Sequence, residues 1–186
     1  GSSYLLSEAA ISKIEKGSTK AEELVKNDSF WKGAKSIGAF GSNLYVLDSN
    51  SLVKLVPAGS EYADSAYLKD DVDLTDAVSM TIDSSIYVLF KNGSVSKFTK
   101  GAKDSFSVSG LTSDLSSPVA IATTEDADKI YVLDPKNARI VSLNKDGSFS
   151  KQYQSDTFST AKTLTLSQDG KTGYVLSGKK VLKVSF

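Results

Sequence analysis

A repeated Tyr-Val-Leu triplet constrains the fold of this chain more than any other feature of its sequence. A variant, Tyr4-Leu5-Leu6, precedes four copies, which are Tyr45-Val46-Leu47, Tyr87-Val88-Leu89, Tyr131-Val132-Leu133 and Tyr174-Val175-Leu176. The tyrosines of successive copies lie 41, 42, 44 and 43 residues apart. A constant period near 40 residues indicates an array of similar structural units.

Further short segments accompany the triplets and alternate between apolar and polar residues, as β-strands do. The segments before the triplets are 36–40, 78–82, 119–123 and 163–166. Those after the triplets place Lys or Ser between apolar neighbours, and they are 11–14, 52–55, 95–98, 140–143 and 181–184. A fourth, less regular set is 23–25, 66–68, 106–108 and 151–153. Polar turns separate the segments, so each repeat is predicted to form four antiparallel strands.

Two stretches carry a resemblance to known repeat families. Residues 130–140, Ile-Tyr-Val-Leu-Asp-Pro-Lys-Asn-Ala-Arg-Ile, resemble the blade signature of NHL-type β-propellers. The turn at 167–171, Ser-Gln-Asp-Gly-Lys, resembles that of YVTN-type bacterial surface propellers. Four strands in about 40 residues also match a propeller blade. The predicted fold is therefore all-β, a β-propeller of about four blades with four antiparallel strands each.

The repeat boundaries predict one β-propeller domain over 4–186, after a tag remnant at 1–3. Complete blades are expected at 34–76, 77–117 and 118–160, and an incomplete last blade at 161–186. Residues 4–33 form either a partial blade or a closing strand. In the closing interpretation, 21–26 supplies the strand that the last blade lacks and closes four blades. Otherwise the chain is a fragment of a larger propeller or a strand-exchanged oligomer. A helix at 7–16 is a further alternative.

Composition excludes several kinds of chemistry. The chain has no Cys and no His, which removes disulfides, thiol nucleophiles, imidazole bases and zinc sites with N or S ligands. Lys+Arg and Asp+Glu are both 22, and Arg139 is the only arginine, so neither nucleic acid nor an anionic surface is favoured as a partner. No cofactor and no membrane span are expected. The compartment stays open, with an extracytoplasmic or cell-surface location preferred.

A run of aspartates is the one candidate metal site. Asp70, Asp71, Asp73 and Asp76 share the loop between two predicted blades. Clustered carboxylates suit Ca²⁺, which takes several oxygen ligands. The spacing does not match an EF-hand loop, and a solvated turn in which Asp76 caps the following strand is the preferred interpretation.

Candidate binding residues lie in loops expected on one face of the blades. Trp31, with Phe30 and Lys32, precedes the first complete blade, and the other candidates are Asp48, Asn50, Lys91, Asn92, Lys136, Asn137 and Arg139. A lone Trp beside a Lys suits a peptide or glycan contact; packing between blades is the alternative and the preferred one. Asp48 and Asp134 are expected to bond the backbone of their own turns, and Asp134 with Arg139 to form an exposed ion pair.

These observations favour a non-catalytic propeller that binds or scaffolds a protein, peptide or glycan. One alternative is a lactonase-like hydrolase with a metal in the central channel, a site that the resemblance would build from Glu, Asn and Asp of inner strands. The corresponding segments here offer Ser, Thr, Gly and Ala. Sialidase chemistry would need an arginine cluster. A purely structural segment of a larger surface protein is the other alternative, and the chain is expected to be a monomer or a strand-exchanged oligomer.

Overall fold

The computed structural model describes residues 2–27 and 30–186, and in this part of the chain the regular structure is β-strand with two short 3₁₀ turns. Gly1 of the predicted tag remnant lies outside the described residues. The chain divides into two compact units, 1–75 and 76–186. No helix of the described residues is long and apolar enough to span a membrane.

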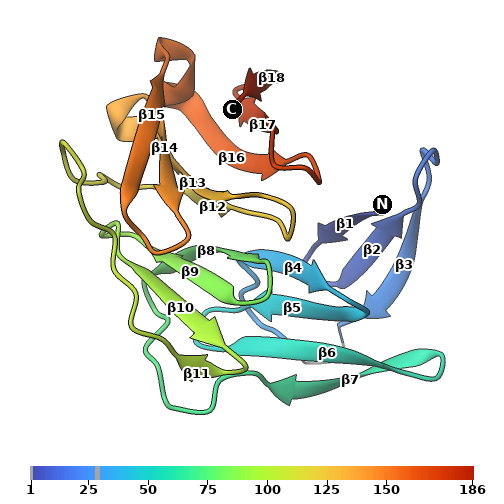
Figure 1. Ribbon diagram of the computed structural model, residues 1–186. Coiled ribbons are helices and arrows are strands. Elements are labelled where there is room, and N and C mark those ends of the chain that lie inside the picture. The colour runs from blue at the N-terminus through green and yellow to red at the C-terminus, as the bar shows by residue number, and fades with distance from the viewer. Residues whose placement is uncertain (1, 28–29) are drawn as a thin grey trace. The chain divides into compact units, whose positions relative to one another are not determined.

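Unit 1 contains two antiparallel sheets whose strands follow one another in chain order (Figure 1). The first sheet consists of β1 (Ser3–Leu6), β2 (Ala10–Ile14) and β3 (Ala21–Lys26). The second consists of β4 (Ser36–Phe40), β5 (Asn43–Leu47), β6 (Leu52–Ala58) and β7 (Glu61–Ala66). The Tyr-Val-Leu triplet forms most of β5, between two hydrogen-bonded neighbours, as the repeat predicts.

Unit 2 contains three further sheets of the same meander topology. The first has β8 (Ala77–Ile82), β9 (Ile86–Phe90), β10 (Val95–Thr99) and β11 (Ala102–Lys103). The second has β12 (Ala120–Ala122), β13 (Lys129–Asp134), β14 (Arg139–Asn144) and β15 (Phe149–Gln154). The third has β16 (Ala161–Leu166), β17 (Thr172–Ser177) and β18 (Lys180–Ser185). The 3₁₀ turns are η1 (Pro135–Asn137) and η2 (Asp156–Thr160).

Residues 2–27 and 30–186 form five blades with three or four strands each, so the prediction of about four blades is wrong. The difference arises at the N-terminus, where β3 pairs with β2 through a register that runs from Ala10↔Lys26 to Ile14↔Ala21. The segment 21–26 therefore belongs to an N-terminal blade of its own, the alternative to the closing strand. The helix considered for 7–16 is also wrong, because Ala10–Ile14 is strand β2.

Fourth strands depart most from the sequence pattern. β7 occupies Glu61–Ala66 instead of 66–68, because β6 extends to Ala58 and turns at Gly59, whose φ of +69° suits glycine. β11 has only two residues, and the predicted strand at 106–108 is not part of a sheet. Weak apolar patterning at an outer strand left these positions poorly specified.

The core forms where the repeat predicts it. Val46, Val88, Val132 and Val175 are fully buried, and Tyr45, Tyr87 and Tyr131 are at most 5% exposed. Tyr174, at the equivalent position of the repeat, is 39% exposed. Tyr131 stacks on Phe186 of the following blade, with ring centroids 3.9 Å apart. Tyr174 lies on β17, and among the described residues no aromatic ring stacks on it in this way.

Replacing Val132 with alanine is expected to lower the free energy of unfolding by about 1–3 kcal/mol, because the change removes buried apolar area and leaves a cavity. Urea melts of the two proteins measure the difference. Val181, which is 69% exposed on β18, is the matched control, and its change to alanine should shift the unfolding free energy by no more than about 0.5 kcal/mol. Equal effects at the two positions would show that β13 is not a core strand.

Candidate functional site

Two aspartates at equivalent turns hold the loops that enter their blades. The Asp48 Oδ1 accepts hydrogen bonds from the backbone amides of Gly33, at 2.6 Å, and Lys32, at 3.2 Å. The Asp134 Oδ1 accepts one from the amide of Ser116, at 3.1 Å. The predicted bonds to their own turns are thus replaced by bonds to backbone 15–18 residues earlier. These carboxylates fix the connections between blades.

Arg139 is buried, which corrects the prediction of an exposed ion pair. Its Nε lies 3.0 Å from Asp134 Oδ2, and the side chains of the two residues are 2% and 0% exposed. The guanidinium also donates to Ser113 Oγ, to Gln152 Oε1 and to the backbone carbonyls of Ser113 and Asp114. The ion pair is confirmed, but the guanidinium is occupied by the connection between β11 and β12 and is not presented to a partner.

Trp31 packs in the core of unit 1, as the packing interpretation predicts. Its ring is 2% exposed, and its indole Nε1 donates to the carbonyl of Ser7 at 3.0 Å. It lies with Ile11, Val25 and residues of β5 and β6, between the two blades of the unit. Phe30 packs partly against the same core, while the Lys32 side chain is exposed.

The remaining candidates are exposed polar residues of the strand-connecting turns. Lys91 lies 4.0 Å from Asp76, and Asn92 accepts hydrogen bonds from the backbone amide and hydroxyl of Ser94. Asn137 donates to Asp134 Oδ2 at 2.8 Å. Lys136 and Asn50 are exposed as well. Asn92 also lines a groove beside β10; the others have local roles or face solvent.

The four aspartates considered as a metal site have exposed side chains. The Asp73 Oδ1 accepts the backbone amide of Thr75 at 2.9 Å, and this hydrogen bond lowers the pKa of the Asp73 carboxyl. Asp71 and Asp73 line an open depression with Asn50, whereas Asp70 is solvated. Among the residues that the structure describes, no group of three or more Asp or Glu is placed to hold a metal ion. The solvated turn is the interpretation that these contacts support.

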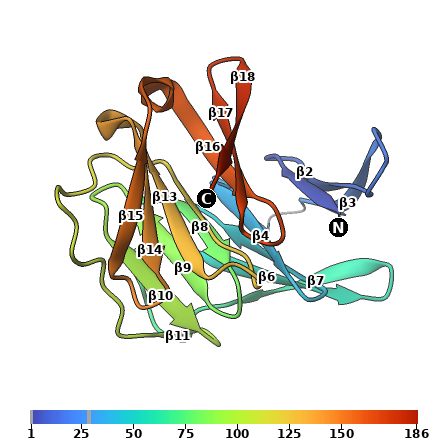
Figure 2. The ribbon, with the colours of Figure 1, turned by 45° about the horizontal axis from the view of Figure 1, so that its top comes forward.

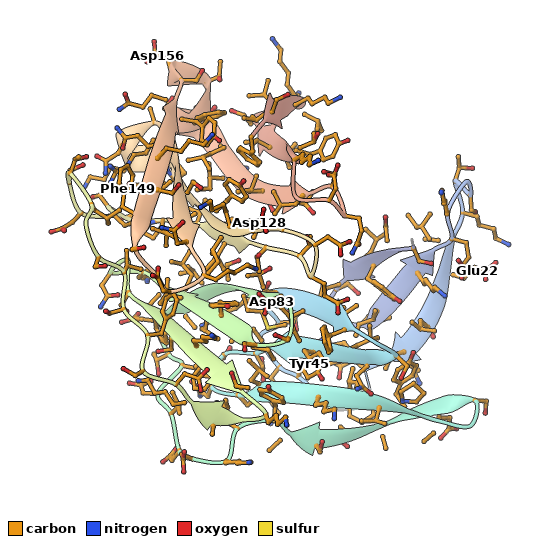
Figure 3. All side chains as sticks on the ribbon, viewed as in Figure 1. Glu22, Tyr45, Asp83, Asp128, Phe149 and Asp156 are labelled. Carbon is orange, nitrogen blue, oxygen red and sulfur yellow. The ribbon has the colours of Figure 1, made fainter. Side chains whose placement is uncertain are left out.

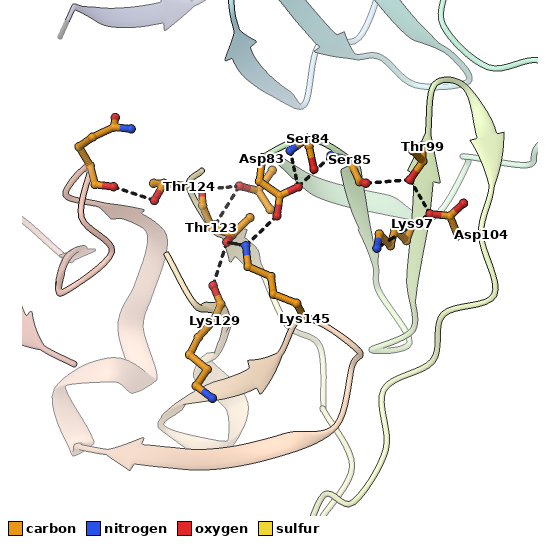
Figure 4. A network of polar contacts seen from close by, with 12 residues as sticks. Asp83, Ser84, Ser85, Lys97, Thr99, Asp104, Thr123, Thr124, Lys129 and Lys145 are labelled. Carbon is orange, nitrogen blue, oxygen red and sulfur yellow. Dashed lines mark hydrogen bonds and ion pairs between the residues drawn. The ribbon is translucent and has the colours of Figure 1, made fainter. Parts of the chain in front are cut away.

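A polar cluster centred on Asp83 was missed by the sequence reasoning (Figure 4). Asp83 follows β8 directly, and its Oδ1 accepts hydrogen bonds from the backbone amides of Ser84 and Ser85. Its Oδ2 accepts from Lys145 Nζ at 2.7 Å. Lys145 lies in the turn between β14 and β15 and also donates to Thr123 Oγ1 at 2.6 Å. The cluster therefore joins two adjacent blades of unit 2. Asp83 and Lys145 are 62 residues apart, and no motif in the sequence indicates that they meet.

The surroundings of Asp83 set the charge of the cluster. Burial acts to raise the pKa of the Asp83 carboxyl, but the hydrogen bonds from Lys145 and from the Ser85 amide outweigh it and the pKa is lowered. Burial, with the nearby Asp83 carboxylate, raises the pKa of the Tyr87 hydroxyl. A cavity of about 330 Å³ opens beside them and is lined by Asp83, Ser84, Ser85, Tyr87, Lys97, Glu125 and Lys145. Asp83 is thus ionised and already paired.

The Asp83 contacts should make stability depend on pH in acid. A carboxyl whose pKa is lower in the folded state stabilises the fold above its unfolded pKa, here 3.8, and loses that contribution as pH falls through the folded value. Asp83→Asn should therefore be less stable than wild type at pH 7 by roughly 1.5–3 kcal/mol. Urea melts between neutral pH and pH 2 should show the two proteins converge below pH 3.8. A difference that stays constant with pH would contradict the ion pair.

A groove lies between β10 and the chain that leaves β11. After β11 the Asp104 amide still donates to the Lys97 carbonyl of β10, and the chain then runs to the next blade as a loop (Figures 1 and 2). The intervening groove has a volume of about 330 Å³. We call it the β10 groove, and its lining residues are Asn92, Gly93, Ser94, Val95, Phe106, Ser107, Val108, Leu111, Asp114 and Leu115. The pattern at 106–108 was visible in the sequence, but it predicted a strand there and not a groove wall.

Leu115 lines the β10 groove and lies close to Gly93. Gly93 has a φ of +89°, and a Cβ at this position would lie 2.7 Å from the Cβ of Leu115. The turn between β9 and β10 therefore touches the connection directly at this point, and only glycine fits without a shift. Phe106, Val108 and Leu111 pack partly against the core of unit 2 and leave their outer surfaces in the groove.

Comparison with solved structures shows the fold. Hydrazine synthase of Kuenenia stuttgartiensis matches 96% of this chain with a TM-score of 0.62 and 10% identity. A Bacteroides uniformis protein provisionally classed as a 6-phosphogluconolactonase matches 95% with a TM-score of 0.61 and 13% identity. A nidogen/laminin complex matches 78% with a TM-score of 0.60 and 14% identity. The chain spans 65%, 60% and 58% of these proteins.

No family model and no curated protein sequence matches this chain. At these identities the structural likeness concerns the fold alone. It agrees with the NHL- and YVTN-like features of the sequence, and together with the five meander sheets it establishes that the chain has a β-propeller fold.

Proposed function

We propose that this chain is a non-catalytic propeller module that binds a protein, peptide or glycan partner through the β10 groove. The observation that carries the proposal is the mixed lining of that groove. Partly buried apolar side chains, Phe106, Val108 and Leu111, lie beside exposed polar ones, Asn92 and Ser94. Apolar centres with polar rims are typical of recognition surfaces, and the volume falls in the range of binding clefts.

The hydrogen bonds of the buried Asp134 and Asp83 carboxylates also support a binding role over hydrolysis. A general base needs an ionised oxygen that can reach a substrate proton. The Asp134 carboxylate accepts hydrogen bonds from Arg139, Asn137 and the Ser116 amide. The Asp83 carboxylate accepts hydrogen bonds from Lys145 and from two backbone amides. These contacts join strands and loops, so they account for both carboxylates without a substrate.

The lactonase-like alternative has one point in its favour. One similar structure is provisionally classed as a 6-phosphogluconolactonase, and the Asp83 cavity offers two carboxylates and two lysines to a small polar molecule. Glucono-δ-lactone with and without added Ca²⁺ is a suitable substrate for the test, together with metal analysis of the purified protein by mass spectrometry. Hydrolysis above background that is lost in Asp83→Asn would favour the enzyme and contradict the binding proposal.

The binding proposal is tested by selection with two probe sets, a glycan array and a phage-displayed library of short random peptides. Ser94→Trp fills the β10 groove from an exposed position. Ser150→Trp, exposed on β15 outside the groove, is the matched control. Ligands recovered with wild type should bind the control equally and Ser94→Trp at least roughly tenfold more weakly. Recovery of no ligand from either set, or equal binding to all three proteins, would contradict the proposal.

A further inference from the structure

The blade β8–β11 lacks most of its fourth strand. In the other four-stranded blades the fourth strands, β7 and β15, have six residues each, whereas β11 has two. β11 pairs with β10 only through Phe98↔Lys103 and Thr99↔Ala102. In the described part of the chain, no strand pairs with the outer side of β10 from Val95 to Ser96. An unpaired edge of this kind offers backbone groups to another strand.

The backbone direction of β10 places these groups in the β10 groove. The Ser94 carbonyl accepts the Phe90 amide and so points toward β9, whereas the Lys97 carbonyl accepts the Asp104 amide and points outward. Hydrogen-bonding direction alternates along an antiparallel strand. The amide and carbonyl of Val95 therefore point outward like those of Lys97, and Val95 lines the groove.

The connection that could have covered this edge is held on the neighbouring blade. Ser109 forms a bridge with Ser148, in which its amide donates to the Gly147 carbonyl and its carbonyl accepts the Phe149 amide at 2.8 Å. A Cβ on Gly147 would lie 2.2 Å from the Ser107 carbonyl oxygen, so the two backbones are in close contact. These contacts keep the segment 107–109 away from β10.

We propose that an extended peptide segment of a partner protein binds as an added strand along β10, an inference that rests on the proposed binding function. Its backbone pairs with the outward amide and carbonyl of Val95 and with the outward amide of Lys97, whose carbonyl already accepts the Asp104 amide; this mode is called β-strand addition. Alternate side chains of a strand point to one side. One set is therefore apolar and contacts Phe106, Val108 and Leu111, and the other set faces solvent.

Charge defines the occupant further. Asp114 is the one charged residue among those that line the β10 groove, and its side chain is exposed. Its backbone carbonyl accepts Arg139, but the guanidinium bonds no oxygen of the Asp114 carboxylate in the described contacts. A carboxylate in this position favours a cation. The peptide should therefore carry a Lys or Arg at the end of the segment that lies next to Asp114.

The experiment uses the full chain and the peptides enriched from the random library. Enriched sequences should alternate apolar with polar residues and contain a basic residue. Peptide addition should slow hydrogen exchange of the Val95 and Lys97 amides, measured by NMR. Methylation of the peptide nitrogens that face β10 should weaken binding at least roughly tenfold, since it removes backbone donors. Peptides that bind without protection of these amides, or that tolerate methylation at every nitrogen, would overturn the inference.

Two exposed aspartates provide the matched test of charge. Asp114→Lys should weaken binding of the enriched peptides roughly fivefold, with a smaller effect at high salt. Asp128→Lys, at an exposed site labelled in Figure 3 and outside the groove, should leave binding unchanged. A peptide whose basic residue is replaced by Glu should prefer Asp114→Lys over wild type. Equal losses in the two variants would contradict the assigned orientation of the peptide.

The outcomes separate this inference from the proposed function. If glycans bind the β10 groove and peptides do not, or if peptides bind in a mode insensitive to Ser94→Trp, strand addition fails. Glycan binding that Ser94→Trp abolishes would still leave the module a binding protein. A dimer that forms with concentration and protects the Val95 amide would overturn the partner peptide in favour of a second copy of the chain, and light scattering measures this directly.

Discussion

Replacing Arg139 with methionine is expected to lower the free energy of unfolding by about 3–5 kcal/mol, because it leaves the buried Asp134 carboxylate without its cation. The change also removes the hydrogen bonds that tie Ser113 and Asp114 to β14. Methionine keeps much of the apolar stem, so lost packing contributes little. Urea melts of wild type and variant measure the effect.

Two further proteins make the Arg139 result specific. Lys136→Met changes an exposed cation of η1, three residues away, and should alter stability by no more than about 0.5 kcal/mol. Combining Arg139→Met with Asp134→Leu removes both charges and should cost less than the sum of the two single changes. An Arg139 effect below about 1 kcal/mol would match an exposed pair and contradict the buried arrangement.

Replacing Gly147 with alanine should destabilise the chain by about 2–5 kcal/mol, from two costs that add. The residue has a φ of +93°, where a side chain costs about 1–2 kcal/mol. Its new methyl group would lie 2.2 Å from the Ser107 carbonyl oxygen, and relief of such overpacking typically costs about 1–3 kcal/mol. Thermal and urea melts measure the loss.

Gly178 separates the two costs in the Gly147 experiment. It has a φ of +57°, and a Cβ added there would meet no atom within 4 Å beyond its chain neighbours, so alanine meets only the backbone cost. Gly178→Ala should therefore destabilise by about 1–2 kcal/mol. The Gly147 variant should also loosen the segment 107–109 and weaken ligand binding in the β10 groove. Equal destabilisation by the two variants would show that the close contact with Ser107 can relax freely.

The repeat allowed much of the fold to be predicted, because the triplet occupies the same buried position in successive blades and this position selects the same residue types. Tyr45, Tyr87 and Tyr131 meet this demand and are buried. The predicted number of blades was wrong because the pattern at 21–26 suits a strand that pairs with the edge of any sheet. In the structure this segment pairs with the nearby strand β2 of the same unit. Tyr174 has the same triplet but is 39% exposed, because burial of this tyrosine depends on a neighbouring blade and not on the triplet itself.

The site was less predictable, because the contacts that build it join residues far apart in the sequence. Asp83 and Lys145 belong to turns of different blades, and neither turn shows an unusual residue type. The β10 groove depends on where the connection after β11 goes, which is set by the fit of Gly147 against Ser107. Trp31 and Arg139 were candidates because each is the single residue of its type in the chain. Both are buried, and their roles are structural, in the core for Trp31 and between strands for Arg139.

The most direct test of the binding account is a calorimetric titration of a ligand selected with wild type into three proteins: wild type, Ser94→Trp and Ser150→Trp. Melts recorded in parallel confirm that all three are folded. The account predicts the same Kd for wild type and Ser150→Trp and a Kd at least roughly tenfold higher for Ser94→Trp. The same Kd for all three folded proteins would place the ligand outside the β10 groove and contradict the account.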